Sequence, residues 1–191
     1  LVDCRTQHFQ VGFKQTELGR VPNWAPFSFG EKTMDLGLQG KIALVTGGSR
    51  GIGKAIARTL ASEGASVAIC ARDLSAVTST AYQLAQETSG VVFAFEADTS
   101  SSDSIERLVQ SVVRQFGGLD ILVNNAARTG GTGGPDTLQA LNEPMLEEDF
   151  QVKVMGYLRC AKFAAPHMVG RGWGRIVNID GMAARQAAGV S

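Results

Sequence analysis

A glycine-rich turn between two apolar segments constrains the fold of this chain more than any other feature. The turn runs Thr46-Gly47-Gly48-Ser49-Arg50-Gly51-Ile52-Gly53 and directly follows the apolar run at residues 42–46. Isoleucine or leucine at positions 52, 56 and 60 then repeats every four residues, which predicts that an amphipathic helix begins here. A strand that leads through such a turn into a helix is typical of a dinucleotide-binding unit, because glycine permits close backbone approach and a helix N-terminus attracts phosphate. The alternative is a tight turn that holds no ligand.

The chain from Lys41 onward alternates between short apolar runs and amphipathic helices. The runs predict strands at 42–46, 66–71, 91–96, 119–124 and 175–179. The helical positions are Ile105, Leu108, Val109, Val112, Val113 and Phe116 in one segment, and Phe150, Val154, Tyr157, Ala161, Ala165 and Met168 in another. Gly64, Gly90 and Gly117 stand where helices are expected to end. This alternation predicts an α/β fold with a doubly wound parallel sheet and right-handed crossovers.

Residues 1–33 differ in character from residues 34–191. They hold five of the 13 aromatic residues and show no sustained helical or strand period, and Met34 offers a natural start. We interpret 1–33 as an N-terminal extension, which is irregular and is upstream sequence, a cloning remnant or a poorly ordered arm. An alternative role for its aromatic side chains is to cover an apolar surface of the domain at 34–191.

The bulk composition argues against several classes of function. The formal net charge is zero, so no overall field favours nucleic acid or a membrane surface, and no apolar run approaches the roughly 18 residues of a membrane span. The three cysteines, Cys4, Cys70 and Cys160, are an odd number without paired spacing, which fits a reducing cytoplasm. The two histidines, His8 and His167, are too few and too far apart to indicate a metal site. We therefore expect a cytoplasmic protein with no metal.

The spacing of the glycines, T-G-x-x-x-G-x-G, resembles the short-chain dehydrogenase/reductase family. Further matches follow in order: Asp98 after the third strand, Asn-Asn-Ala-Ala at 124–127 and Arg-Ile-Val-Asn-Ile at 175–179. The resemblance covers about residues 36–185. It implies a Rossmann-like sheet of order 3-2-1-4-5, with the last strands of the family fold absent from these residues, which leaves the domain incomplete at its C-terminus.

The resemblance also implies a nicotinamide cofactor, and the residues favour NADP(H). An acidic side chain after the second strand binds the free ribose hydroxyl of NAD, whereas arginine binds the 2′-phosphate of NADP. The position of that acid is Ala71, and Arg72 follows it, while Arg50 lies inside the glycine turn. Two alternatives remain open: the arginines are solvated surface charges, or a register shifted by two residues makes Asp73 the acid.

The family pattern implies a set of cofactor-binding residues in this chain, in which Asp98 contacts the adenine ring. The set is Gly47, Ser49, Arg50, Gly51, Ile52, Gly53, Arg72, Asp98, Thr99, Asn125 and Ala126.

The catalytic residues cannot be assigned, because the sequence departs from the family pattern at each position. Family enzymes use a tyrosine, a lysine four residues later, a serine near the fifth strand and an asparagine in the preceding helix. The serine position is Gly181, the asparagine position is Lys153, and the tyrosine and lysine would fall beyond Ser191. Lys153 is either a functional replacement or a boundary lysine that extends to water. Asp180 is a further candidate to hydrogen-bond a substrate.

The sequence favours an NADP(H)-dependent oxidoreductase that reduces a carbonyl or oxidises an alcohol of a small molecule. A cofactor-binding module without turnover, or a truncated gene product, is the alternative. The resemblance also implies a homo-oligomer that forms through the helix at 147–170. Neither the substrate nor the direction of reaction follows from these residues.

Overall fold

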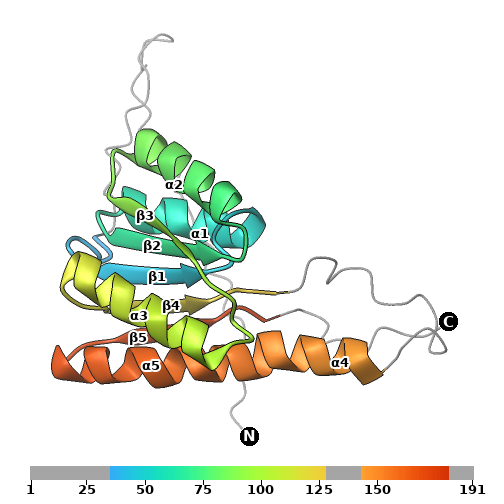
Figure 1. Ribbon diagram of the computed structural model, residues 1–191. Helices are drawn as coiled ribbons and strands as arrows, with labels where there is room; N and C mark the ends of the chain where they lie inside the picture. Colours follow the sequence, from blue (N-terminus) through green and yellow to red (C-terminus); the bar gives the residue numbers. More distant parts are fainter. Residues whose placement is uncertain (1–34, 128–142, 181–191) are drawn as a thin grey trace, which may run out of the picture. The chain divides into compact units, whose positions relative to one another are not determined.

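The structure is a computed structural model that describes residues 35–127 and 143–180, all in one compact unit that begins at Asp35 (Figure 1). Its elements are β1 (Ile42–Thr46), α1 (Gly51–Ser62), β2 (Ser66–Ala71), α2 (Leu74–Thr88), β3 (Val92–Glu96), α3 (Ser102–Phe116), β4 (Ile121–Asn124), α4 (Glu143–Asp149), the π-helical turn η2 (Phe150–Met155), α5 (Gly156–Gly170) and β5 (Arg175–Asn178). No helix in this described part is long and apolar enough to cross a membrane. The extension expected at 1–33 lies outside the described residues.

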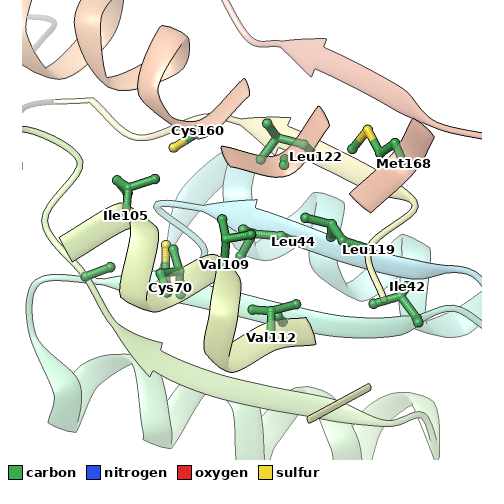
Figure 2. Close-up of a cluster of buried hydrophobic side chains, with 14 residues drawn as sticks. Ile42, Leu44, Cys70, Ile105, Val109, Val112, Leu119, Leu122, Cys160 and Met168 are labelled. Carbon is green, nitrogen blue, oxygen red and sulfur yellow. The ribbon is translucent and has the colours of Figure 1, made fainter. Parts of the chain in front are cut away.

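The five strands form one parallel sheet in the order β3-β2-β1-β4-β5, which confirms the predicted fold class. Successive strand residues point to opposite faces, so Leu44 belongs to a core that α3 and α5 cover, whereas Val45 belongs to a core that α1 and α2 cover. Figure 2 shows the first core, in which Leu44 and Leu122 of the sheet lie among Ile105 and Val109 of α3 and Cys160 of α5. Both faces of the sheet are therefore covered by helices, as a doubly wound fold requires.

The strand boundaries agree with the sequence to within two residues, whereas the helical segment predicted at 147–170 begins earlier, at Glu143. β3 begins at Val92 and β4 at Ile121, slightly later than predicted. Gly64 and Gly117 adopt left-handed backbone after α1 and α3, as expected, but α2 ends differently. There Ser89 takes the left-handed conformation with φ of 54°, while an added Cβ on Gly90 would lie 3.1 Å from the carbonyl oxygen of residue 61. Gly90 is thus needed where the chain passes close to α1, and it does not cap α2.

The buried face predicted for α1 is partly wrong. Ile52 is 62% exposed, and the fully buried positions are Gly53, Ala57 and Ala61, with Ile56 and Leu60 only partly buried beside them. The small residues allow the helix axis to lie close to the sheet. The spacing of the large apolar residues therefore predicted the edge of the buried face. It did not predict the centre of that face, which glycine and alanine occupy.

The face predicted for the helix at 150–168 is also partly wrong, although Met168 is buried as predicted. Phe150 and Val154 are 49% and 52% exposed, whereas the buried stripe follows Val152, Gly156, Cys160, Ala164 and Met168. The π-helical turn adds residues per turn and shifts the phase of the helix before α5 begins. An added Cβ on Gly156 would lie 3.1 Å from the carbonyl oxygen of Thr99, so the helix needs a small residue where it approaches the segment after β3.

A buried carboxylate fixes the edge of the sheet at which the strands begin. The Asp120 side chain is 2% exposed, and its Oδ2 accepts a 2.9 Å hydrogen bond from the backbone N–H of Ile42 at the start of β1. Its Oδ1 accepts a 2.7 Å hydrogen bond from Nε of Arg171, which follows α5. The backbone carbonyl of Asp120 accepts from the N–H of Arg175. One residue therefore ties β1, β4, α5 and β5 together.

Replacing Asp120 by asparagine is expected to lower the free energy of unfolding by about 2 kcal/mol. The amide removes the negative charge that two donors share and turns an N–H₂ group toward one of them. Chemical denaturation followed by circular dichroism measures the change. Glu106→Gln, which changes an exposed carboxylate on α3, is the matched control and should cost less than about 0.5 kcal/mol. Equal losses in the two variants would contradict the role given to Asp120.

Candidate cofactor-binding cleft

A cleft of about 710 Å³ opens at the carboxyl ends of β1, β2, β3 and β4. This is the edge where open parallel sheets bind ligands, at the point where the strand order reverses. Eight of the eleven predicted cofactor residues line it: Gly47, Ser49, Arg50, Arg72, Asp98, Thr99, Asn125 and Ala126. The structure therefore brings together residues from four separate segments of the sequence.

The other three predicted residues, Gly51, Ile52 and Gly53, form the first turn of α1 and do not line the cleft. Gly51 has a φ of 55°, a conformation that L-residues rarely adopt. Gly53 is buried, and an added Cβ would lie 2.3 Å from the carbonyl oxygen of Gly47 and 2.4 Å from Nδ2 of Asn125. Gly51 and Gly53 therefore set the backbone conformation of the turn without lining the cleft.

A hydrogen-bond network joins the glycine turn to the end of β4. The hydroxyl oxygen of Thr46 accepts hydrogen bonds from the backbone N–H groups of Asn125 and Ala126, at 3.0 and 3.1 Å. In return, Nδ2 of Asn125 donates to the carbonyl oxygens of Thr46 and Gly47, both at 3.1 Å. Because these bonds run in both directions, the turn and the Asn-Asn-Ala-Ala segment form one rigid wall of the cleft.

Helix α2 holds the other side of the same turn. The hydroxyl of Thr80 donates a 2.8 Å hydrogen bond to the carbonyl oxygen of Ser49, and the N–H of Gly48 donates to the carbonyl oxygen of Cys70. Sequence analysis did not single out Thr80, because no face was assigned to this helix. A buried threonine at the helix position that faces the turn is the feature that could have indicated it.

The end of β2 carries the charges that bear on cofactor choice. β2 ends at Ala71, as predicted, and Arg72 and Asp73 follow it along the cleft. Asp73 is the N-cap of α2, where its Oδ1 accepts a 3.0 Å hydrogen bond from the N–H of Ala76. Such a cap stabilises the helix by about 1 kcal/mol, so this carboxylate already has a structural role.

The segment after β3 forms the far wall. Oδ1 of Asp98 accepts hydrogen bonds from the backbone N–H and the hydroxyl of Ser100, at 2.9 and 2.8 Å. The carbonyl oxygen of Thr99 accepts a 3.4 Å hydrogen bond from Arg159 of α5. Three other lining residues, Ala71, Asp73 and Ala127, stand in the predicted motifs but were not assigned to the cofactor, and a further group was not predicted: Cys70, Ala76, Ser79, Thr80, Ala97 and Val152. Most are small, so only their position at strand and helix ends could have marked them.

Lys153 and Asp180, the residues considered for catalysis, are not among those that line the cleft. Nζ of Lys153 forms a 3.1 Å ion pair with Asp149, and both side chains are about two-fifths exposed. Tyr157 donates a 2.9 Å hydrogen bond to the carbonyl oxygen of Ile179. Burial raises the pKa of its hydroxyl, and the nearby Asp180 adds to the effect. Gly181 lies outside the described residues.

Two buried thiols are expected to resist modification. Burial raises the pKa of both Cys70 and Cys160 from 9.0 to about 12, and both lie in the core that Figure 2 shows. A thiol reacts as its thiolate, so both should stay unreactive toward a disulfide reagent at mildly alkaline pH. In a Cys4→Ser variant, the native chain should react with almost none of the reagent and so release almost none of its coloured product. The denatured chain should release two equivalents, one for each of Cys70 and Cys160. Rapid release of one equivalent from the native chain would contradict this burial.

A family model described as short chain dehydrogenase matches residues 41–190. The chloroplastic NADPH-dependent aldehyde reductase 1 of Arabidopsis thaliana is 32% identical, over 85% of this chain and 56% of its own length. Curated relatives are covered over 52–57% of their length, so this chain spans about half of them.

Solved structures with the same fold include proteins with either nicotinamide cofactor. L-sorbose reductase from Gluconobacter frateurii, complexed with NADPH and L-sorbose, superposes with a TM-score of 0.70 and 34% identity, covering 76% of this chain and 54% of that one. An NAD⁺-bound xylitol dehydrogenase superposes with a TM-score of 0.73 and 29% identity, covering 78% and 56%.

Proposed function

This chain belongs to the short-chain dehydrogenase family, and we propose that it binds NADP(H) in the cleft and serves hydride transfer at a carbonyl or alcohol carbon. The observation that carries this proposal is the glycine turn, which leads from the carboxyl end of β1 into the N-terminus of α1, where a dinucleotide-binding fold holds a pyrophosphate. A Cβ at Gly53 would collide with the backbone of Gly47, so the turn keeps its shape only with glycine there. The cleft volume of about 710 Å³ is also within the range of small-molecule cofactor sites.

The preference for NADP(H) over NAD(H) rests on Arg50, Arg72 and Asp73. Both arginines line the cleft, and a guanidinium pairs with a phosphate through two parallel hydrogen bonds. Asp73 caps α2, which gives its carboxylate a reason to be present other than binding a ribose hydroxyl. An NADPH-dependent relative and an NADPH-bound structure support the choice, while an NAD⁺-bound neighbour shows that the fold serves either cofactor.

The remaining cofactor contacts are assigned by position along the cleft. Backbone N–H groups at the N-terminus of α1 would bind the pyrophosphate, aided by the helix dipole. Asp98 and Thr99 would hold the adenine end, and Asn125 and Ala126 would border the nicotinamide half. The proposed cofactor residues are Gly47, Ser49, Arg50, Gly51, Ile52, Gly53, Arg72, Asp98, Thr99, Asn125 and Ala126. When bound, the nicotinamide ring supplies or accepts the hydride.

Turnover by the 191-residue chain tests the reaction. The chain is mixed with NADPH and a panel of small carbonyl compounds, including an aldehyde and a keto sugar as the names of its relatives suggest. Loss of the reduced-nicotinamide absorbance, with formation of the matching alcohol, would support an oxidoreductase. Cofactor binding without turnover of any compound would instead favour a binding module.

Self-association and cellular location complete the proposal. The helical segment 147–170 exposes Phe150, Val154 and Leu158 at intervals of four residues, an apolar stripe suited to a second copy. We propose a homo-oligomer through this stripe, which sedimentation of the purified chain would test, and a location in the cytoplasm.

A further inference from the structure

A second hollow lies beside the cofactor cleft and takes no part in the proposed function. It has a volume of about 560 Å³, and we call it the α3 pocket because three of its polar lining residues, Ser104, Arg107 and Ser111, come from that helix. Arg72 lines both the α3 pocket and the cofactor cleft. The two hollows therefore share a wall that contains a cation.

Donor groups of the α3 pocket are free to bind a ligand. Neither Arg72 nor Arg107 forms a hydrogen bond or ion pair with another residue in the described part of the chain. The hydroxyl oxygen of Ser104 accepts a 3.0 Å hydrogen bond from the N–H of Asp98, and that of Ser111 accepts one of 3.0 Å from Arg114. Each serine therefore keeps its own hydroxyl proton for a ligand.

Acceptor groups of the α3 pocket are fewer. Oδ1 of Asp98 already accepts two hydrogen bonds from Ser100. Glu96 is exposed at the end of β3, and its carboxylate opposes an anion here, as does the charge of Asp98. Two guanidinium groups and two hydroxyl groups supply the donors, and the two carboxylates balance the charge of the arginines, so it is the set of donors that matches an oxyanion with several acceptor oxygens. Arginine pairs with phosphate in the same way as with a carboxylate, through two parallel hydrogen bonds.

We propose that the α3 pocket binds a phosphate group, carried by inorganic phosphate or a phosphomonoester, at a site separate from that of the cofactor. Phosphate bound here holds Arg72 away from the cleft and places negative charge beside it. Binding therefore weakens the affinity for NADPH more than the affinity for NADH. This coupling rests on the proposed function, whereas phosphate binding itself does not.

The first test uses inorganic phosphate and the full 191-residue chain without cofactor. In ¹H–¹⁵N spectra, phosphate should shift the amide signals of Ser104, Arg107 and Ser111 saturably, and sodium chloride at the same ionic strength should not. Arg107→Gln should weaken binding about tenfold, and Arg107→Lys by less, because lysine keeps the charge but loses the paired hydrogen bonds. Glu96→Gln should tighten binding about twofold or more, because it removes an opposing charge.

Arg58→Gln is the matched control, since Arg58 is an exposed arginine of α1 that lines neither hollow. It should leave phosphate affinity unchanged. The proposal is overturned if folded chain shows no saturable shift, or if Arg107→Gln binds phosphate as tightly as the unaltered chain.

The second test separates a free phosphate from the phosphate of the cofactor. Without added phosphate, Arg107→Gln should bind NADPH as tightly as the unaltered chain does. A loss confined to NADPH would mean that this pocket holds the 2′-phosphate of the cofactor, and would overturn a separate site. With phosphate added, NADPH affinity should fall severalfold in the unaltered chain and stay constant in Arg107→Gln. A chain that binds phosphate but no nicotinamide cofactor would refute the proposed function and leave the phosphate site standing.

Discussion

Replacing Gly53 by alanine is expected to remove measurable cofactor binding and to destabilise the chain. The new Cβ would lie 2.3 Å from the carbonyl oxygen of Gly47 and 2.4 Å from Nδ2 of Asn125. Either α1 or the turn must then move, and that movement displaces the backbone groups that face the pyrophosphate. We expect the affinity for NADPH to fall at least about 100-fold, and the free energy of unfolding to fall by about 1–3 kcal/mol.

Gly170→Ala provides the matched control for this substitution. Gly170 ends α5, and an added Cβ there meets no atom within 4 Å, so both affinity and stability should be preserved. Fluorescence titration with NADPH and chemical denaturation measure the two quantities. A Gly53→Ala chain that binds NADPH with unchanged affinity would refute the role of the glycine turn.

Replacing Arg72 by glutamine is expected to reduce the preference for NADPH over NADH by about 10- to 100-fold. The guanidinium at the end of β2 lines the cleft and makes no ion pair with the described residues. Its loss removes charge-assisted hydrogen bonds to the 2′-phosphate, which only NADPH carries. Affinity for NADH should therefore stay within about twofold.

The control for Arg72→Gln again uses Arg58→Gln, which removes the same formal charge from α1 outside the cleft. Titrations are run in phosphate-free buffer, so that an anion in the α3 pocket does not alter the result. If Arg72→Gln weakened the binding of NADPH and of NADH equally, the arginine would not recognise the 2′-phosphate. Asp73 would then become the residue to test for ribose recognition.

The parts of the fold that follow from local sequence were predictable. The strands at 42–46 and 66–71 match β1 and β2 because buried parallel strands require continuous apolar runs. The buried face of α3 was also predicted, since Ile105, Leu108 and Val112 are large, apolar and spaced at helical intervals. Eight of the residues that line the cleft were predicted, because the glycine turn and the carboxyl ends of parallel strands lie at one edge of the sheet.

What the sequence could not predict depends on packing between elements. Gly156 and Ala164 line the buried face of α5 because the helix lies close to its neighbours, and small residues carry no periodic apolar pattern. The π-helical turn at Phe150–Met155 changes the phase of that face without a mark in the sequence. The α3 pocket likewise forms only where β3 and α3 meet, so Arg107 could not be singled out.

The central claim is that the cleft binds NADP(H), and one titration tests it most directly. The folded 191-residue chain is titrated separately with NADPH and NADH while the fluorescence of the reduced nicotinamide is followed. We expect saturable binding of NADPH that is clearly tighter than binding of NADH. Saturable binding of neither cofactor, in a sample whose circular dichroism shows a folded α/β protein, would contradict the account.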